Sequence, residues 1–400
     1  MLSSKAKNAV MIGTLCSISY FAVYIIKNTL SAVTPQMIDS GYTEAYIGGI
    51  SALYLVFYAI GQLINGAIGD KIKAKWMISI GLLGAGIMNF VFSRITLIPE
   101  AATIVYGLAG FFLSMIYGPM TKVVAENTDP LHATRCSLGY TFASLLGSPM
   151  AGLLASFLTW QSVFNVGSSA LTFMSVIAFV FFSIFERRGI VKYGQYKTSK
   201  KGVGNIKILF EREIVKYSLI AIITGVVRTS VVFWLPTYIS KHLEFSPSDA
   251  AKLFTAATLV ISLTAFVAVF IYERLGCNIN KTLILVFSSS AVFFILTYFV
   301  KNPILNIICI VLAIMSSNAA ATMLWSRYCP SLRDTGMVSS ATGFLDFLSY
   351  IAAGAANIIF ANAAISIGWG NLILVWLSIV TAGVVVVLPY KKIKNRFLSK

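Results

Sequence analysis

Twelve apolar stretches, each about 20 residues long, follow one another along this chain. A helix rises about 1.5 Å per residue, so each stretch is long enough to cross the hydrocarbon core of a bilayer. The composition agrees, because 58% of the residues are hydrophobic and only 11% are charged. The sequence therefore predicts an all-α membrane protein with twelve transmembrane helices. Their expected spans are 9–34, 46–69, 76–95, 101–124, 134–158, 162–185, 216–240, 247–273, 279–300, 304–325, 336–361 and 366–389.

The positive charges orient these helices. With both termini in the cytoplasm, 25 of the 31 Lys and Arg residues fall in inner segments and 4 in outer ones, while Lys27 and Arg228 lie within the membrane. This asymmetry follows the positive-inside rule. It accounts for the net charge of +17 without nucleic acid, so no nucleic-acid partner is expected. We expect a multi-pass protein of a bacterial inner membrane, whose first apolar stretch is retained as a helix.

The chain repeats itself after about 200 residues. Lys27 lies eight residues before Pro35, and Arg228 lies eight residues before Pro236. One long polar stretch separates the sixth and seventh spans. We therefore predict two pseudo-symmetric six-helix bundles, residues 1–186 and 216–400, joined by a cytoplasmic linker at 187–215 that carries a short surface helix. Repeats of this kind bind their solute between the halves, near the middle of the membrane.

The two intramembrane cations indicate what is bound. A lysine or arginine at mid-membrane costs about 2.5–3.5 kcal/mol on insertion scales, so such residues usually face a partner or a hydrated cavity. Snorkelling to a headgroup is the alternative. Polar residues at helical spacing form one stripe in the first span and one in the eleventh: Ser17, Tyr20, Tyr24, Lys27 and Ser31, then Ser339, Thr342, Asp346, Ser349 and Tyr350. Lys27, Arg228 and Asp346 together carry a net charge of +1, so a cavity lined by them favours an anionic solute.

Two motifs carry a resemblance to a known family. The stretch GAIGDKIKAK after the second span resembles the signature loop of the major facilitator superfamily. The stretch RTSVVFWLPTY, which begins at Arg228 and contains Trp234, is similar to the seventh helix of the organophosphate:phosphate antiporters, the glycerol-phosphate and hexose-phosphate transporters. The resemblance implies the twelve-helix major facilitator fold.

The resemblance also implies a binding site. It places Lys27 and Arg228 on the substrate anion, with the family's tyrosines matched by Tyr20, Tyr24, Tyr58 and Tyr350 and with Trp234 beside them. Asp346 is an additional acid where the family is expected to have a small residue, and we expect it in the same site. Asp70 and Lys71 are expected to act as gating residues at the cytoplasmic side, by charge pairing with a neighbouring helix end. The tyrosines could instead pack between helices, and Trp234 could belong to an interfacial aromatic belt. Asp346 could neutralise Arg228 or carry a coupling proton. Where the family has a phosphate-binding arginine this chain has Lys27, which lacks the bidentate fork of a guanidinium.

Together these features predict a secondary active transporter of a small organic anion, an organophosphate or sugar phosphate exchanged for phosphate by alternating access. A proton-coupled symporter of a carboxylate or sugar acid is the alternative, and a membrane sensor of hexose phosphate is an alternative of another class. No phosphate-binding GxxxxGK[ST] motif is present. We therefore expect no enzyme activity, no cofactor and no metal. We also expect a monomer whose partners are the small anion and the lipid bilayer. Five glycines, Gly107, Gly110, Gly118, Gly147 and Gly152, are expected at close helix contacts.

Overall fold

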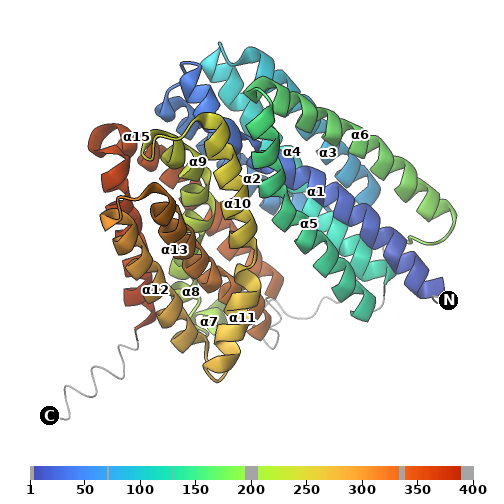
Figure 1. Cartoon of the computed structure of the whole chain (residues 1–400). Helices are drawn as coiled ribbons and strands as arrows, with labels where there is room; N and C mark the ends of the chain where they lie inside the picture. Colours follow the sequence, from blue (N-terminus) through green and yellow to red (C-terminus); the bar gives the residue numbers. More distant parts are fainter. Residues whose placement is uncertain (1–3, 70–71, 129, 194–205, 333–337, 389–400) are drawn as a thin grey trace, which may run out of the picture. The chain divides into compact units, whose positions relative to one another are not determined.

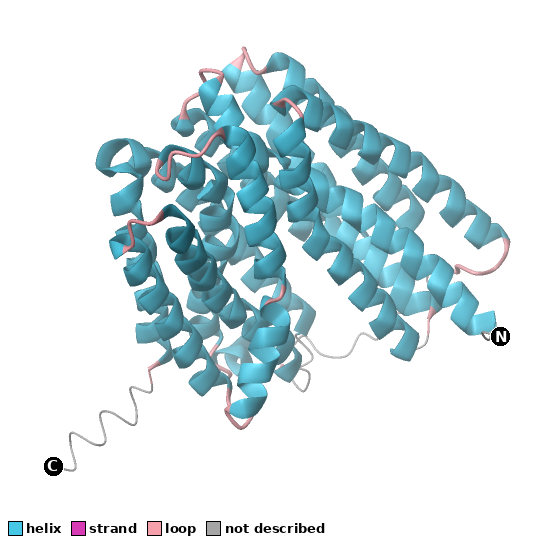
Figure 2. Ribbon diagram, viewed as in Figure 1, coloured by secondary structure: helices cyan, strands magenta, loops and turns pink. Residues whose placement is uncertain are grey.

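The described part of the chain is almost entirely helical. The computed structural model describes residues 4–69, 72–128, 130–193, 206–332 and 338–388 (Figure 1). Within these ranges the helices are joined by short loops and no strand occurs (Figure 2). Backbone groups cannot bond to water inside a bilayer, and helices satisfy them internally. The predicted all-α membrane class is confirmed.

The helices follow the predicted spans closely. The first half contains α1 (Ser4–Asp39), α2 (Glu44–Gly69), α3 (Ala74–Ile95), α4 (Pro99–Asn127), α5 (Pro130–Phe157) and α6 (Trp160–Arg187). The second half begins with α7 (Ile206–Glu211), α8 (Ile214–Gly225), the π-helix η1 (Val226–Val231) and α9 (Val232–Lys241). It continues with α10 (Pro247–Ser262), α11 (Thr264–Arg274), α12 (Ile279–Phe299), α13 (Pro303–Met323), the π-helix η2 (Leu324–Tyr328), α14 (Cys329–Ser331) and α15 (Val338–Val387).

The described residues account for all twelve predicted spans. Ten helical stretches are long and apolar enough to cross a membrane, with α8, η1 and α9 forming one of them, and α5 contributes a shorter apolar stretch. The long α15 contains two spans, because its backbone leaves the helical region at Gly368, where φ is 78°. This positive φ is a conformation that glycine adopts without a Cβ penalty. The break falls just after residue 366, where the last span was predicted to begin.

Several helices begin at recognisable N-terminal signals. Pro303 opens α13, and the Asn302 side chain accepts hydrogen bonds from the backbone N–H groups of Ile304 and Leu305, both at 3.1 Å. Pro99 likewise opens α4. Proline lacks an N–H that would be unsatisfied at this position, and an Asn cap satisfies the N–H groups that follow it.

The chain divides into two compact units. Unit 1 comprises residues 1–201, 233–262 and 354–365, and unit 2 comprises residues 202–232, 263–353 and 366–400. Each unit is described by itself below. The division into bundles 1–186 and 216–400 with a linker at 187–215 stays a prediction from the sequence. The surface helix expected in the linker region corresponds to α7.

In unit 1, α1 packs along α5, α2 packs against α4, and α3 packs against α4 and α6. The α1–α5 contact is close at Gly147, where an added Cβ would lie 2.7 Å from the backbone carbonyl carbon of Tyr24. Only a glycine fits at that separation. Between α3, α4 and α6, the rings of Phe92, Tyr106 and Phe164 form a buried cluster, with centroids 4.7 Å and 5.1 Å from Phe92.

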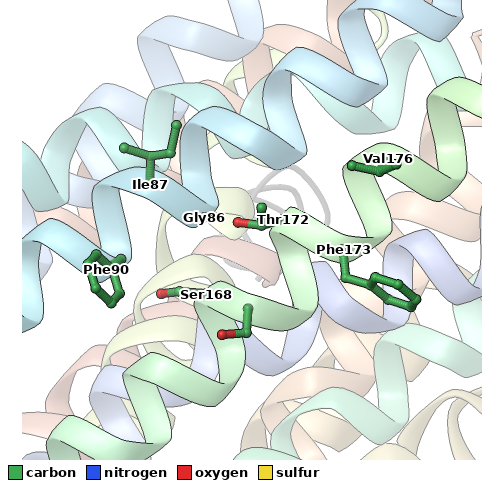
Figure 3. A pocket seen from close by; sticks show the side chains of 8 residues that line it. Gly86, Ile87, Phe90, Ser168, Thr172, Phe173 and Val176 are labelled. Atoms are coloured by element: carbon green, nitrogen blue, oxygen red, sulfur yellow. The ribbon is translucent and has the colours of Figure 1, made fainter.

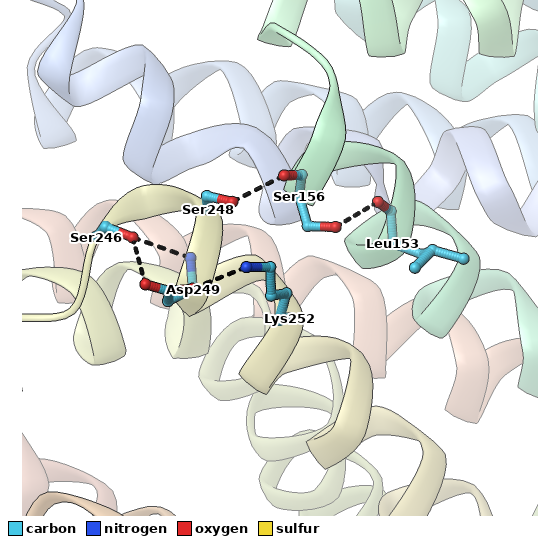
Figure 4. A network of polar contacts seen from close by, with 6 residues as sticks. All are labelled: Leu153, Ser156, Ser246, Ser248, Asp249 and Lys252. Atoms are coloured by element: carbon cyan, nitrogen blue, oxygen red, sulfur yellow. Dashed lines mark hydrogen bonds and ion pairs between the residues drawn. The ribbon is translucent and has the colours of Figure 1, made fainter.

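Unit 1 also joins the first half of the chain to segments of the second half. The Ser31 hydroxyl donates to the Phe233 carbonyl at 2.7 Å, and Lys241 pairs with Asp39 at 2.7 Å. At the start of α10, the Ser248 hydroxyl donates to the Ser156 carbonyl of α5 at 2.7 Å (Figure 4). These polar contacts add to close helix packing between α5 and α10, where an added Cβ on Gly152 would lie 3.0 Å from the Ala251 carbonyl oxygen.

In unit 2, α12 packs along α13, and the buried Ser290 hydroxyl donates to the Ala313 carbonyl at 2.8 Å. The rings of Tyr217 in α8 and Tyr328 in η2 stack with centroids 3.5 Å apart, and the Tyr328 hydroxyl donates to the Arg212 carbonyl. These contacts hold α8 beside η2. They fix the beginning of the segment that carries Arg228.

Candidate functional site

Lys27 lies within the membrane-spanning α1 and is surrounded by aromatic rings. Its Nζ lies 4.3 Å from the ring centroid of Tyr58 in α2 and 5.2 Å from that of Tyr24. The lysine is half-buried, and Tyr58 is buried. An ammonium over an aromatic ring is stabilised by about 0.5–2 kcal/mol, with the larger value when water is excluded. The structure therefore brings Lys27, Tyr24 and Tyr58 together as the sequence predicted.

The polar stripe of α1 is held in place by α5. Tyr24 is seated against Gly147, and Ser17 lies beside Gly139, where an added Cβ would lie 2.8 Å from the serine hydroxyl. Tyr20 packs edge-on against Tyr24 with centroids 4.9 Å apart. Close backbone contact on this side leaves the ring of Tyr24 little freedom. Packing thus orients the aromatic groups that contact Lys27.

Two further tyrosines that the sequence reasoning did not identify join this cluster. Tyr117 of α4 and Tyr140 of α5 lie 5.5 Å and 6.1 Å from Tyr20, centroid to centroid, and 6.2 Å from each other. They belong to different helices, so no spacing along the sequence connects them with Lys27. The available signal was a tyrosine within each of these two apolar spans.

Arg228, the second predicted cation, lies in η1 in unit 2 and is half-buried. A π-helix contains one residue more than an α-helix of the same length, and such segments are frequent at functional sites. Two contacts with α15 bracket the arginine. An added Cβ on Gly225 would lie 2.7 Å from the Ser349 carbonyl, and the Ser230 hydroxyl donates to the Ala353 carbonyl at 2.7 Å.

Gly225 lies beside Ser349, and Ser230 lies beside Ala353, so Arg228 lies beside the turn of α15 between these two residues. Residue numbers rise in the same direction in both segments, so the segments run parallel. Tyr350 lies within about two residues of the level of Arg228, while Asp346 lies about five residues, or roughly 8 Å, toward the N-terminal end of α15. Tyr350 is buried and Asp346 is half-buried. Unit 2 thus carries three of the predicted site residues on two adjacent segments.

Trp234 is fully buried in unit 1, with an exposed fraction of 0%. Its ring packs against Phe233 at 5.1 Å and faces Gly48 of α2, where an added Cβ would lie 3.4 Å from the indole. A side chain in a lipid-facing aromatic belt would be exposed at the protein surface, so that alternative is wrong in this structure. The predicted contact between Trp234 and substrate stays a prediction.

The predicted gating residues Asp70 and Lys71 lie outside the described residues. Two lysines of the same motif are described: Lys73 and Lys75 both pair with Glu186 at the end of α6. The Tyr193 ring lies 5.7 Å from the Lys73 ammonium, and burial, with the nearby Glu186 carboxylate, raises the pKa of this tyrosine. The basic motif is thus tied to α6.

A surface groove of about 510 Å³ lies between α3 and α6, away from these residues (Figure 3). It is lined by Gly86, Ile87 and Phe90 of α3 and by Ser168, Thr172 and Phe173 of α6. Phe173 is 69% exposed, as expected for a side chain that faces lipid. The groove contains no cation, so it is not the predicted anion site. Among the described residues, no group of His, Cys, Asp and Glu could hold a metal ion.

The fold and these residues define a multi-pass helical membrane protein with cations inside its membrane spans. The family model of the Major Facilitator Superfamily matches residues 16–357. The chain belongs to the Major Facilitator Superfamily, and the prediction that it is not an enzyme is confirmed by this membership.

Its relatives agree with the resemblance to organophosphate:phosphate antiporters. The glycerol-3-phosphate transporter of Bacillus subtilis (strain 168) is 23% identical over 256 residues, which cover 58% of this chain and 58% of that protein. The membrane sensor protein UhpC of Salmonella typhimurium is 26% identical over 96 residues, or 24% of this chain and 22% of that protein. The chain thus matches less than two thirds of the length of each of these relatives.

Solved structures show the same fold over nearly the whole chain. The nucleoside transporter NupG has a TM-score of 0.72 at 14% identity, covering 95% of this chain and 97% of that one. A D-xylose-proton symporter has a TM-score of 0.73 at 13% identity, covering 96% and 97%. At these identities the likeness shows the fold alone.

Proposed function

We propose that this chain is a secondary active transporter that moves a small organophosphate across the membrane in exchange for inorganic phosphate, by alternating access. The observation that carries the proposal is the surroundings of Lys27, a cation inside a membrane helix between the rings of Tyr24 and Tyr58. Tyrosine rings stabilise the ammonium, and their hydroxyls are suited to bind phosphate oxygens beside it. A relative named as a glycerol-3-phosphate transporter supports this substrate class.

Arg228 is the second anion-binding group of the proposal. A guanidinium presents a planar fork that matches two phosphate oxygens, whereas Lys27 acts as a point charge. Both cations are half-buried, so a bound anion would offset part of the cost of enclosing their charges when the carrier closes. The loaded carrier would therefore reorient more readily than the empty one, which is the physical basis for obligate exchange.

Alternating access requires contacts that can be broken and made again. The contacts between α1 and α9 and between α5 and α10 in unit 1 are of this kind. They include the exposed Lys241–Asp39 ion pair and the hydroxyl-to-carbonyl bonds of Ser31 and Ser248. Exposed ion pairs contribute about 0–1 kcal/mol, and single hydrogen bonds contribute about 0.5–1.5 kcal/mol. These polar contacts can separate at modest cost, and the packing between α5 and α10 is the larger contact.

A second candidate is a proton-coupled symporter of a carboxylate or sugar acid, which is favoured by the half-buried Asp346 on a membrane helix. Acidic residues inside membrane spans often belong to proton pathways. A sensor that binds hexose phosphate is a third candidate, since one relative is named a membrane sensor protein.

Counterflow in proteoliposomes distinguishes the three candidate functions. Exchange predicts that uptake of glycerol phosphate needs phosphate inside the vesicle, is lost in Lys27→Ala, and persists in Lys252→Ala, whose exposed lysine pairs with Asp249 on the surface. A symporter would instead take up solute on a pH gradient without internal phosphate, and Asp346→Asn would abolish this uptake. A sensor would bind the anion and transport nothing. Either of the last two results would refute the exchange proposal.

A further inference from the structure

Beyond the cation, unit 1 contains a cluster of aromatic rings, Tyr20, Tyr117 and Tyr140, whose exposed member, Tyr117, the proposed function leaves unused. We propose that Tyr117, backed by Tyr20 and Tyr140, is a subsite for the organic part of the substrate, and that it selects hydroxylated carbon skeletons over inorganic phosphate. This inference rests on the proposed function, because it needs the anionic end of the substrate to be held at Lys27.

The rings form a continuous path that starts at the lysine. Lys27 Nζ lies 5.2 Å from the Tyr24 ring centroid, Tyr24 lies 4.9 Å from Tyr20, and Tyr20 lies 5.5 Å from Tyr117. Along α1, Tyr20 precedes Lys27 by seven residues, or about 10 Å of helix. A solute anchored at the lysine and extending toward the N-terminal end of α1 therefore approaches the level of Tyr117.

Tyr117 is the member of the cluster that a solute can reach. Its exposed fraction is 42%, compared with 8% for Tyr20 and 3% for Tyr140. The two buried rings hold the exposed one from behind, at tilted and edge-on angles typical of stable aromatic pairs. A ring supported in this way presents a fixed surface, so little conformational freedom is lost when a solute lies against it.

Tyr117 differs from lipid-facing residues both in the direction in which it points from α4 and in the residues beside it. On α4 the exposed apolar residue Ile104 precedes it by 13 residues, which places the two side chains about 140° apart around the helix axis. The next residue, Gly118, is also exposed, and a Cβ added there would meet no atom within 4 Å. Lipid-facing surfaces carry large apolar side chains, as α3 does with Phe90. A tyrosine beside an open glycine is better suited to water and a polar solute.

The chemistry of tyrosine fits a polyol or a sugar. Its ring packs against C–H groups, and its hydroxyl exchanges hydrogen bonds with substrate hydroxyls. Inorganic phosphate has no organic part and cannot reach from Lys27 to Tyr117. Glycerol phosphate reaches part of the way, and a hexose phosphate reaches further. Loss of Tyr117 should therefore weaken binding in proportion to the length of the carbon skeleton.

The test is the affinity of the purified full-length chain for inorganic phosphate, glycerol 3-phosphate and glucose 6-phosphate, measured by calorimetry for the wild type and for Tyr117→Ala. We expect unchanged affinity for inorganic phosphate, a small loss for glycerol 3-phosphate, and a loss of roughly threefold to tenfold for glucose 6-phosphate, the range set by one net hydrogen bond. Tyr298→Ala is the matched control, because Tyr298 is 40% exposed and packs against Phe299 in unit 2.

Three outcomes would overturn the inference. Equal losses for all three anions would show that Tyr117 acts only through the fold. Unchanged affinities would show that no substrate touches it, and this result would leave the proposed function intact. If the wild type binds none of the anions, the proposed function fails and the inference fails with it. If Tyr117→Ala does not fold, Tyr117→Phe replaces it, because this variant keeps the ring and removes only the hydroxyl. A selective loss of affinity for glucose 6-phosphate relative to inorganic phosphate would then support the inference, and an unchanged ratio of the two affinities would contradict it.

Discussion

Replacing Gly147 by alanine tests how α5 positions the aromatic groups around Lys27. The new Cβ would lie 2.7 Å from the backbone carbonyl carbon of Tyr24, whereas ordinary contact begins at 3.4 Å. The Tyr24 Cβ lies closer still, and both atoms are fixed to the α1 backbone, so no rotamer change relieves the clash and α1 must move by more than roughly 0.7 Å. Overpacking of this kind typically costs about 1–3 kcal/mol. Binding groups need to stay within about 0.5 Å of their productive geometry, so anion affinity should also fall, by about threefold to tenfold.

The assay combines thermal unfolding of the purified protein with calorimetric titration of glycerol phosphate. Gly49→Ala is the control, since Gly49 is a helical glycine of α2 with no atom within 4 Å of an added Cβ. Alanine there removes the helix penalty of glycine and should leave stability equal or higher. If Gly147→Ala matched this control in both stability and affinity, the close α1–α5 contact would not position Tyr24 as described.

Three further predictions concern other contacts. Ser230→Ala removes the buried hydrogen bond to the Ala353 carbonyl and should lower the free energy of unfolding by about 1–3 kcal/mol, measured by denaturant titration. Burial lowers the pKa of His242 in the folded protein, so just below pH 6.5 the unfolded state binds more protons than the folded state. The free energy of unfolding should therefore fall as the pH is lowered through this window. Thermal melts of His242→Gln should show a smaller fall. A double-mutant cycle on Asp39 and Lys241 should give a coupling of about 0.2–1 kcal/mol that weakens in high salt.

The helices could be predicted because length and hydropathy decide them. Each span needs about 20 apolar residues, and the structure places every predicted span within a few residues of its expected position. Even the last boundary was correct, since the break at Gly368 follows the gap left between residues 361 and 366. Lys27 beside Tyr24 and Tyr58 was also anticipated, because helical spacing places Tyr24 next to the lysine and the family resemblance supplied Tyr58.

The predicted close contacts of the glycines are confirmed at some positions and wrong at another. Gly110, Gly147 and Gly152 do lie at close contacts, with added Cβ atoms within 3.0 Å of neighbouring backbone oxygens or carbons. Gly118 was expected to behave alike, but that prediction was wrong because nothing lies near it. Sequence shows that a residue is small and does not show whether a neighbouring helix uses the space.

Two features of the candidate site could not be read from one sequence. The π-helix at Arg228 departs from the 3.6-residue period on which helical patterns are judged, and its stabilising contacts come from α15, more than a hundred residues later. Tyr117 and Tyr140 join Tyr20 through the packing of three helices. Only tertiary structure brings such residues together.

The central claim is that Lys27 and Arg228 bind the anion, and calorimetry on the purified full-length chain tests it most directly. Loss of a charged hydrogen-bonding partner costs about 1.5–3 kcal/mol, or roughly 10- to 150-fold in affinity. We predict a loss of this size for glycerol phosphate in Lys27→Ala and again in Arg228→Ala, with wild-type affinity in the surface variant Lys252→Ala. Wild-type affinity in either intramembrane variant would contradict the account.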